Sequence, residues 1–214
     1  MIYNIIMTDK GSFLSKTAKS YLYNNWEKRV NFVAIGKAPV NREVQEILNY
    51  STGGVLKERL KKYGWTDLIH PHLIFILENG SEPMRFEREA QLIVRDELTQ
   101  TPEDQWMIMD IKELNLTLGD MIENHLKFYN TDTYDKLISY SPMNQNSQTF
   151  VRDFLRANGL LTPQIIKFFV QPLNKIMSGF KWTNSAVNKL VRIGYIFEVL
   201  KGNGNGECCD SDSE

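Results

Sequence analysis

The sequence predicts an α+β protein, in which a small antiparallel sheet packs on an amphipathic helix and an apolar helical appendage follows. Two observations favour this class. Residues 65–89 have the pattern of a β-hairpin, and residues 146–158 have the apolar spacing of a helix. The chain has 214 residues, of which 42% are apolar and 24% charged, so it is long and apolar enough to bury a sizeable core.

The first helix that the pattern predicts covers residues 54–63. Its apolar residues, Val55, Leu56 and Leu60, supply a buried side. Its charged residues are Lys57, Glu58, Arg59, Lys61 and Lys62. We expect these charges to form a solvated face, and a phosphate or lipid-headgroup site is the alternative. The preceding Gly53-Gly54 pair is too short to be a phosphate-binding loop.

The hairpin comes next in the chain. Residues 65–78 predict a strand that ends in an Asn79-Gly80 turn, and residues 82–89 predict the returning strand. Side chains alternate along a strand, so His70 and His72 share one face. Either imidazole could then face a neighbouring helix.

The region between the hairpin and the second predicted helix is mixed. Residues 105–110 have the pattern of a strand, and residues 117–129 have that of a helix with a broad apolar stripe. His125 lies at the boundary of this stripe, where a structural histidine is more frequent than a ligand.

The helix of residues 146–158 has clear ends. Asn146 is a good N-cap, and Gly159 supplies the C-terminal stop. Ser147 therefore falls in the first turn, near the positive end of the helix dipole. A thiolate would be stabilised there, whereas a serine hydroxyl gains far less and needs a base to remove its proton.

A helical appendage of residues 161–201 follows, with one helix beginning at Thr162 and Pro163 and another at Thr183 or Asn184. We expect it to pack on the preceding domain. The alternative is docking on a protein partner, within a larger assembly, or on a membrane surface. Residues 202–214 predict a flexible acidic tail.

The overall charge and the cysteines limit the partners. With 25 basic and 26 acidic residues the net charge is −1, so we expect no nucleic-acid partner. The only cysteines, Cys208 and Cys209, are adjacent, which predicts neither a disulfide framework nor a metal site and suits a reducing, cytoplasmic compartment. No secretory signal or membrane-spanning run is recognised, and no cofactor is expected.

A family resemblance joins the hairpin to the helix. The segment Asn146-Ser-Gln-Thr-Phe-Val151 resembles the Asn-Cys-Gln-x-Phe-Val box of the circularly permuted papain-like proteins, the NlpC/P60-related group with lecithin retinol acyltransferase-like and PPPDE-type members. In those families a histidine strand precedes the cysteine helix, and Asp67-Leu-Ile-His70 resembles its start. The resemblance covers roughly residues 40–160 and implies a permuted papain-like domain over residues 1–160.

The resemblance implies roles for four residues. Ser147 stands at the nucleophile position, His70 is the expected base with His72 as the second choice, and Glu87 would orient the imidazole. Arg85 lies on the Glu87 face of the returning strand, so a plain ion pair between these two residues is a competing interpretation.

The serine decides the expected function. A serine in a site built for sulfur usually loses most of the rate, so we expect a non-catalytic binding or structural component. Permuted relatives with this helix box occur in large DNA viruses, so the resemblance suggests a viral assembly and a virion location. The alternative is a cysteine hydrolase or acyltransferase for amide, thioester or ester bonds, in which Ser147 is an engineered change. A working serine enzyme ranks last, because no Gly-x-Ser-x-Gly motif is present.

Overall fold

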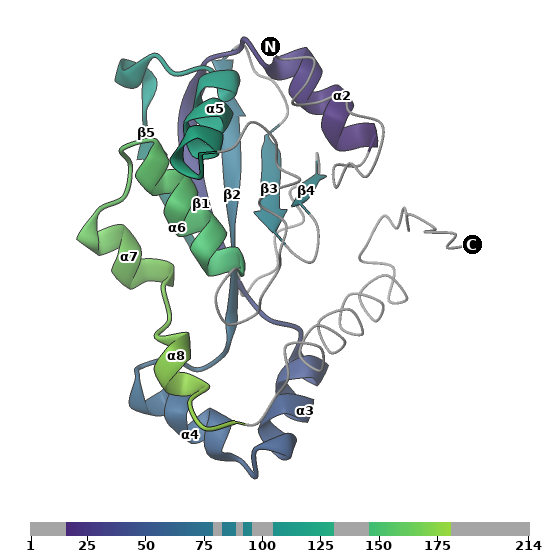
Figure 1. The fold of residues 1–214 in the computed structure, drawn as a ribbon, viewed down its shortest axis with the longest axis vertical. Helices are drawn as coiled ribbons and strands as arrows, with labels where there is room; N and C mark the ends of the chain where they lie inside the picture. Colours follow the sequence, from purple (N-terminus) through teal and green to yellow (C-terminus); the bar gives the residue numbers. More distant parts are fainter. Residues whose placement is uncertain (1–15, 79–82, 89–91, 96–104, 131–145, 181–214) are drawn as a thin grey trace.

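The computed structural model describes residues 16–78, 83–88, 92–95, 105–130 and 146–180. Its strands are β1 (Val30–Pro39), β2 (Ile69–Leu77), β3 (Met84–Arg88), β4 (Leu92–Arg95) and β5 (Gln105–Asp110). They form one five-stranded sheet in the order β4-β3-β2-β1-β5, and every neighbouring pair is antiparallel. The predicted α+β class with a small antiparallel sheet is therefore confirmed (Figure 1).

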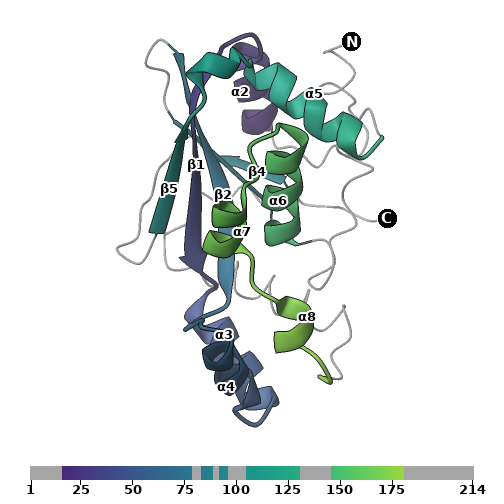
Figure 2. The ribbon, with the colours of Figure 1, turned by 90° about the vertical axis from the view of Figure 1, so that its left-hand side faces the viewer.

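The helices are α2 (Lys16–Asn25), α3 (Arg42–Ser51), α4 (Val55–Lys62), α5 (Leu118–Phe128), α6 (Ser147–Ala157), α7 (Pro163–Phe169) and α8 (Leu173–Ile176), with a 3₁₀ turn η2 (Lys112–Leu114). Figure 2 shows α5, α6 and α7 on one face of the sheet and α3, α4 and α8 beyond its end. The predicted hairpin pairs as expected, with Leu73 opposite Phe86, while its Asn79-Gly80 turn lies outside the described residues.

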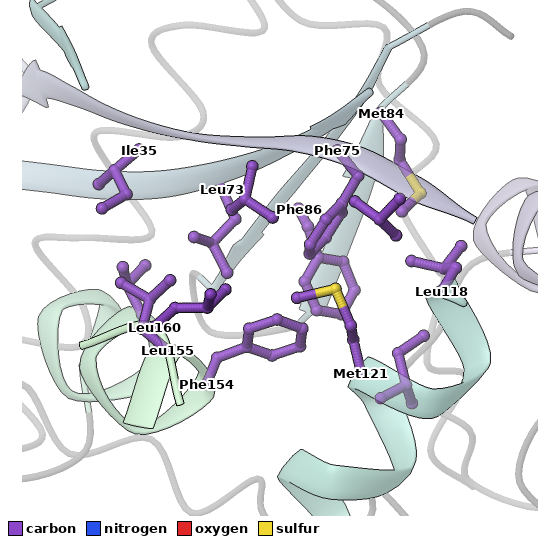
Figure 3. Packing of buried hydrophobic residues seen from close by; sticks show 14 of the residues in the cluster. Ile35, Leu73, Phe75, Met84, Phe86, Leu118, Met121, Phe154, Leu155 and Leu160 are labelled. Carbon is purple, nitrogen blue, oxygen red and sulfur yellow. The ribbon is translucent and has the colours of Figure 1, made fainter. Parts of the chain in front are cut away.

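The main core lies between the sheet and α5 and α6 (Figure 3). Period-2 alternation along β2 turns Leu73 and Phe75 toward these helices, and both side chains are fully buried. The Phe75 ring lies 5.5 Å from that of Phe154, and Phe86 lies 5.4 Å from Phe150, measured between ring centroids. Aromatic packing at these distances fixes α6 across β2 and β3.

A second, smaller core holds together α3, α4 and α8, which we call the helical lobe. Its buried residues are Val44, Leu48, Leu56, Leu60, Leu68, Ile176 and Met177. The lobe is inserted between β1 and β2, and α8 joins it from the C-terminal part of the chain. Arg59 of α4 fastens α8 by donating hydrogen bonds to the carbonyl oxygens of Ile176 and Ser178.

Of the appendage predicted for residues 161–201, the structure describes residues 161–180. The helix begins where predicted, with the Thr162 hydroxyl accepting a hydrogen bond from Ile165 N and Pro163 in the first helical position. Phe169 of α7 is buried in the main core, whereas Ile176 of α8 is buried in the helical lobe. The helix predicted from Thr183 or Asn184 and the tail of residues 202–214 lie outside the described part of the chain.

Candidate functional site

An imidazole, a carboxylate and a guanidinium meet on the face of the sheet that points away from the main core. His70 Nε2 lies 3.3 Å from Glu87 Oε2, and Arg85 donates a hydrogen bond of 3.1 Å to the same carboxylate oxygen. Glu87 is only 2% exposed, while His70 keeps 22% of its side chain accessible. Both predicted partners of Glu87 are therefore present together, the imidazole and the competing arginine.

The contact between His70 and Glu87 is close but is not a hydrogen bond of ordinary geometry. Its distance lies within ion-pair range, but His70 Nε2 makes no hydrogen bond with any described residue. Arg85 contacts the Glu87 carboxylate through a hydrogen bond of 3.1 Å and a second nitrogen at 3.0 Å, and its positive charge neutralises much of the carboxylate charge. A neutral imidazole accepts protons, so the site holds a group of the kind that a general base requires.

His72 fills a slot deeper in the same face. Gly36 of β1 pairs with His72 of β2 on one side and with Trp106 of β5 on the other. A Cβ atom at Gly36 would stand 2.2 Å from His72 Nε2 and 2.5 Å from the Trp106 ring, so only glycine leaves room for both rings. The two rings meet edge to face, with 5.1 Å between centroids.

Burial controls the charge of His72. The side chain is fully buried, and neither ring nitrogen makes a hydrogen bond with the described residues. Desolvation and, to a smaller extent, the positive charge of Arg85 lower the pKa of His72 to about 3. The ring is therefore neutral near pH 7, and His72 has the surroundings of a core histidine.

Ser147 is the first residue of α6. The Asn146 side chain accepts a hydrogen bond from Thr149 N, and the Thr149 hydroxyl accepts one from Asn146 N, which forms a reciprocal cap. Ser147 is 7% exposed. Across the described ranges, its hydroxyl makes no hydrogen bond with the imidazole of His70 or of His72.

Gln148, the neighbour of Ser147, connects α6 to the start of β2. It exchanges two hydrogen bonds with Gln171, accepting from Gln171 N at 2.8 Å and donating to Gln171 Oε1 at 3.0 Å. Gln171 also accepts from Ile69 N and donates to Asp67 O. Gln148 Nε2 itself lies 3.5 Å from Ile69 O. The residue beside Ser147 thus touches the residue beside His70.

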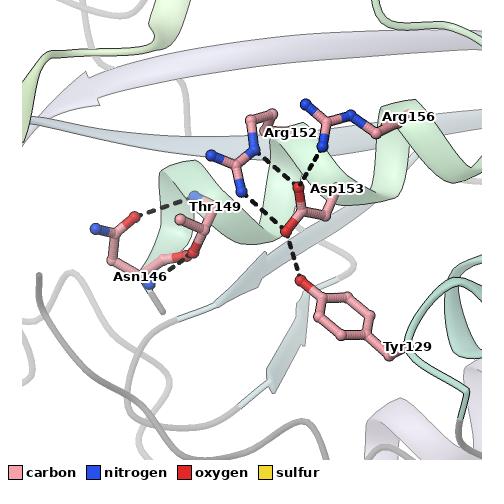
Figure 4. A network of polar contacts seen from close by, with 6 residues as sticks. All are labelled: Tyr129, Asn146, Thr149, Arg152, Asp153 and Arg156. Atoms are coloured by element: carbon pink, nitrogen blue, oxygen red, sulfur yellow. Dashed lines mark hydrogen bonds and ion pairs between the residues drawn. The ribbon is translucent and has the colours of Figure 1, made fainter. Parts of the chain in front are cut away.

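A second polar network fixes α6 from its other side (Figure 4). Asp153 is nearly buried and accepts hydrogen bonds from the Tyr129 hydroxyl at 2.6 Å and from Arg152 at 2.8 and 3.1 Å. The hydrogen bonds with Asp153 raise the pKa of Arg152. Asp153 is paired with Arg152 and lies 4.0 Å from Arg156, and its bond with Tyr129 reaches the end of α5, so we assign the network the structural role of joining α6 to α5.

The structure thus brings His70, His72 and Glu87 together, and it places Ser147 at the end of a helix on the other face of the sheet. Sequence reasoning missed Gly36, Trp106 and Gln171. The first two could be recognised only from the pairing of β1 with both neighbours. Gln171 stands before Pro172, and this local sequence does not indicate that its side chain is buried or hydrogen-bonded.

Neither a metal site nor a membrane span is found in the described ranges. No group of three or more histidine, cysteine, aspartate or glutamate side chains there is arranged to hold a metal ion. None of the helices in those ranges has the length and apolar character needed to cross a bilayer.

Comparisons of the chain with family models, with curated proteins and with solved structures found no match.

Proposed function

We propose that this chain is a non-catalytic protein that resembles the permuted papain-like group and acts as a binding or structural component. The observation that carries the proposal is the state of Ser147, whose hydroxyl makes no hydrogen bond with His70 or His72 in the part of the chain that is described. A serine hydroxyl without a base is a poor nucleophile, because its proton is lost only at very high pH. The polar residues around it are committed to structure instead.

A viral assembly is the setting that the resemblance favours. Partners would then be proteins of the same assembly, contacted through the C-terminal helices. In α7 the support is Ile166, which remains 38% exposed beside the buried Ile165 and Phe169.

The second candidate is a cysteine hydrolase or acyltransferase in which Ser147 replaces the nucleophile. Two contacts favour it. Glu87 lies against the imidazole of His70, as an orienting carboxylate would, and Gln148 touches Ile69, which brings the helix end to the histidine strand. A thiol at position 147 would then belong to a site that lowers its pKa.

The experiment that separates the two candidates measures the pKa of a thiol introduced by Ser147→Cys. Cys208 and Cys209 are first replaced by serine, so that iodoacetamide reports one position. The matched control is Arg42→Cys in the same background, because Arg42 is also the first helical residue after an asparagine N-cap. The control therefore contains the helix dipole without the histidines.

For a non-catalytic protein, the thiol at position 147 should titrate at or above the control value, near the model value of about 8.5. Adding His70→Gln should leave it unchanged. A pKa at least about one unit below the control that rises again with His70→Gln would reverse the proposal, since it would show an imidazolium stabilising the thiolate.

A further inference from the structure

The helical lobe presents its outer surface to solvent at the far end of the molecule. Figure 1 shows α3 and α4 beyond the end of the sheet, with the turn between them pointing away from it. Gly53 and Gly54 form this turn with φ of 62° and 87°, a conformation that favours glycine and allows a tight reversal. The Asn49 side chain accepts a hydrogen bond from Lys57 N, so the end of α3 is fixed to the start of α4.

Three lysines on α4 have exposed side chains. Within the described part of the chain, no aspartate or glutamate lies within ion-pair distance of Lys57, Lys61 or Lys62. Arg59 differs from them, because it is bound to α8 and stacks on Phe180. The lysines give the exposed side of α4 a positive charge that only Glu58 offsets.

Two large side chains on α3, which packs against α4 in the lobe, are exposed although they are apolar or aromatic. Tyr50 is 89% exposed, the largest value among the exposed large hydrophobic residues of the described chain, and Ile47 is 43% exposed one helical turn before it. Tyr50 and Lys57 flank the Gly53-Gly54 turn. We call Ile47, Tyr50, Lys57, Lys61 and Lys62 the lobe surface.

We propose that the lobe surface binds peripherally to an anionic phospholipid membrane. Lysines near a bilayer are attracted by anionic headgroups, and a tyrosine places its ring in the apolar boundary while its hydroxyl stays with the headgroups. Ile47 adds apolar area on the same helix. A nucleic acid fits less well, because the chain carries a net charge of −1 and three lysines on one short helix offer few phosphate contacts.

Sedimentation of the full chain with vesicles tests this proposal. The protein should bind vesicles of phosphatidylcholine with phosphatidylserine and not vesicles of phosphatidylcholine alone. Binding should be largely lost in about 1 M salt, where the Debye length is about 3 Å. Replacing all three lysines, as Lys57→Gln with Lys61→Gln and Lys62→Gln, should weaken binding about tenfold or more.

Matched variants distinguish binding through the lobe surface from a general attraction between positive charges and the vesicle. Lys112→Gln with Lys127→Gln and Lys167→Gln removes three other exposed lysines and should change binding less than about twofold. Tyr50→Ser should weaken binding to anionic vesicles, whereas Leu114→Ser, at a residue 50% exposed elsewhere, should not. Thermal unfolding of each variant verifies that it is folded.

Three results would overturn the proposal. The first is no sedimentation with anionic vesicles at low salt. The second is an equal loss for both lysine triples, which would show attraction without a defined surface. The third is binding to a single-stranded oligonucleotide that is stronger than vesicle binding and is lost with the α4 triple, which would make the surface a nucleic-acid site.

Discussion

At the scale of single residues, the decisive feature is a buried imidazole that is neutral in the folded state near pH 7. His72 has a pKa of about 3 because burial disfavours its charged form. The groups that face it are Arg85, Glu87 and His70, of which Arg85 opposes its protonation further and Glu87 favours it to a smaller extent. In the unfolded chain the same histidine has a pKa of about 6.5.

The stability of the protein should therefore fall as the pH is lowered from about 6.5 toward 3. In this window the unfolded chain binds one more proton at His72 than the folded chain does, so the free energy of unfolding rises with pH by up to about 1.4 kcal/mol per unit. His72→Phe removes the titrating group and should flatten this slope. Urea unfolding at several pH values measures it, and an unchanged slope in His72→Phe would contradict the assignment.

The sequence predicted part of this cluster. Alternation along β2 correctly placed His70 and His72 on one face, and it also identified Arg85 as a competitor for Glu87. It could not show which face α6 covers, because that depends on whether Leu73 and Phe75 or the histidines pack against Phe154. The space that Gly36 leaves for His72 depends on sheet register, which no local pattern contains.

At the scale of elements, the capped helices α6 and α7 were predicted, whereas α3, which the Asn41 side chain caps, was not. The ends of α6 and the start of α7 agree with the structure because Asn146 and Thr162 make the expected cap hydrogen bonds. β1 was not predicted, although it lies inside the sheet between β2 and β5, since its mixture of Gly36, Lys37 and Pro39 with apolar residues shows no clean alternation. Tertiary pairing with β2 and β5 makes it a strand.

Lys37 illustrates how β1 is fixed to the helices. Its ammonium donates a hydrogen bond to Phe168 O in the last turn of α7 and lies 4.5 Å from the centroid of the Phe168 ring. A cation at a helix C-terminus is favourable because the carbonyl oxygens there carry partial negative charge. Burial nevertheless lowers the pKa of Lys37. The contact joins β1 to α7 without a counter-ion in the described ranges.

Gln171 links α6, β2 and the segment before α8, and its removal should be costly. Gln171→Ala would remove the side-chain oxygen that accepts from Ile69 N and from the buried Gln148 Nε2, while the bond from the backbone N of residue 171 to Gln148 would remain, so we expect a loss of about 2–4 kcal/mol in the free energy of unfolding. Gln164→Ala, at an exposed position on α7, is the matched control and should cost less than about 0.5 kcal/mol. Chemical denaturation measures both, and equal losses would show that the buried hydrogen bonds contribute little.

At the scale of the whole molecule, the chain builds two cores of unequal size. The main core joins the sheet to α5 and α6, and the lobe core joins α3, α4 and α8, with no buried residue in common. Between them the described chain crosses from β1 to α3, from α4 to β2 and from α7 to α8. Two glutamines, Gln45 and Gln171, hydrogen-bond across these crossings, Gln45 to Leu68 N and Val40 O.

A small core attached through a few crossings should open on its own, because local unfolding costs less where few apolar contacts are lost. Leu60→Ala in the lobe should therefore speed amide hydrogen exchange in α3, α4 and α8 while β2 and α6 remain protected. The matched change in the main core is Leu155→Ala, which removes the same atoms from a side chain that is also almost fully buried. It should cost about 2–5 kcal/mol and speed exchange in both cores, because loss of the sheet removes the lobe's anchors.

The two variants are expected to differ in which elements exchange faster, and this difference tests whether the two cores unfold separately. If the lobe opens separately, Leu60→Ala changes only the lobe amides, whereas Leu155→Ala changes both sets. If the crossings at Gln45 and Gln171 make the two cores one cooperative unit, Leu60→Ala will speed exchange in β2 and α6 as much as in α4. That second result would mean that the hydrogen bonds of Gln45 and Gln171 transmit stability between the cores, and combining Leu60→Ala with Gln171→Ala should then confine the effect to the lobe.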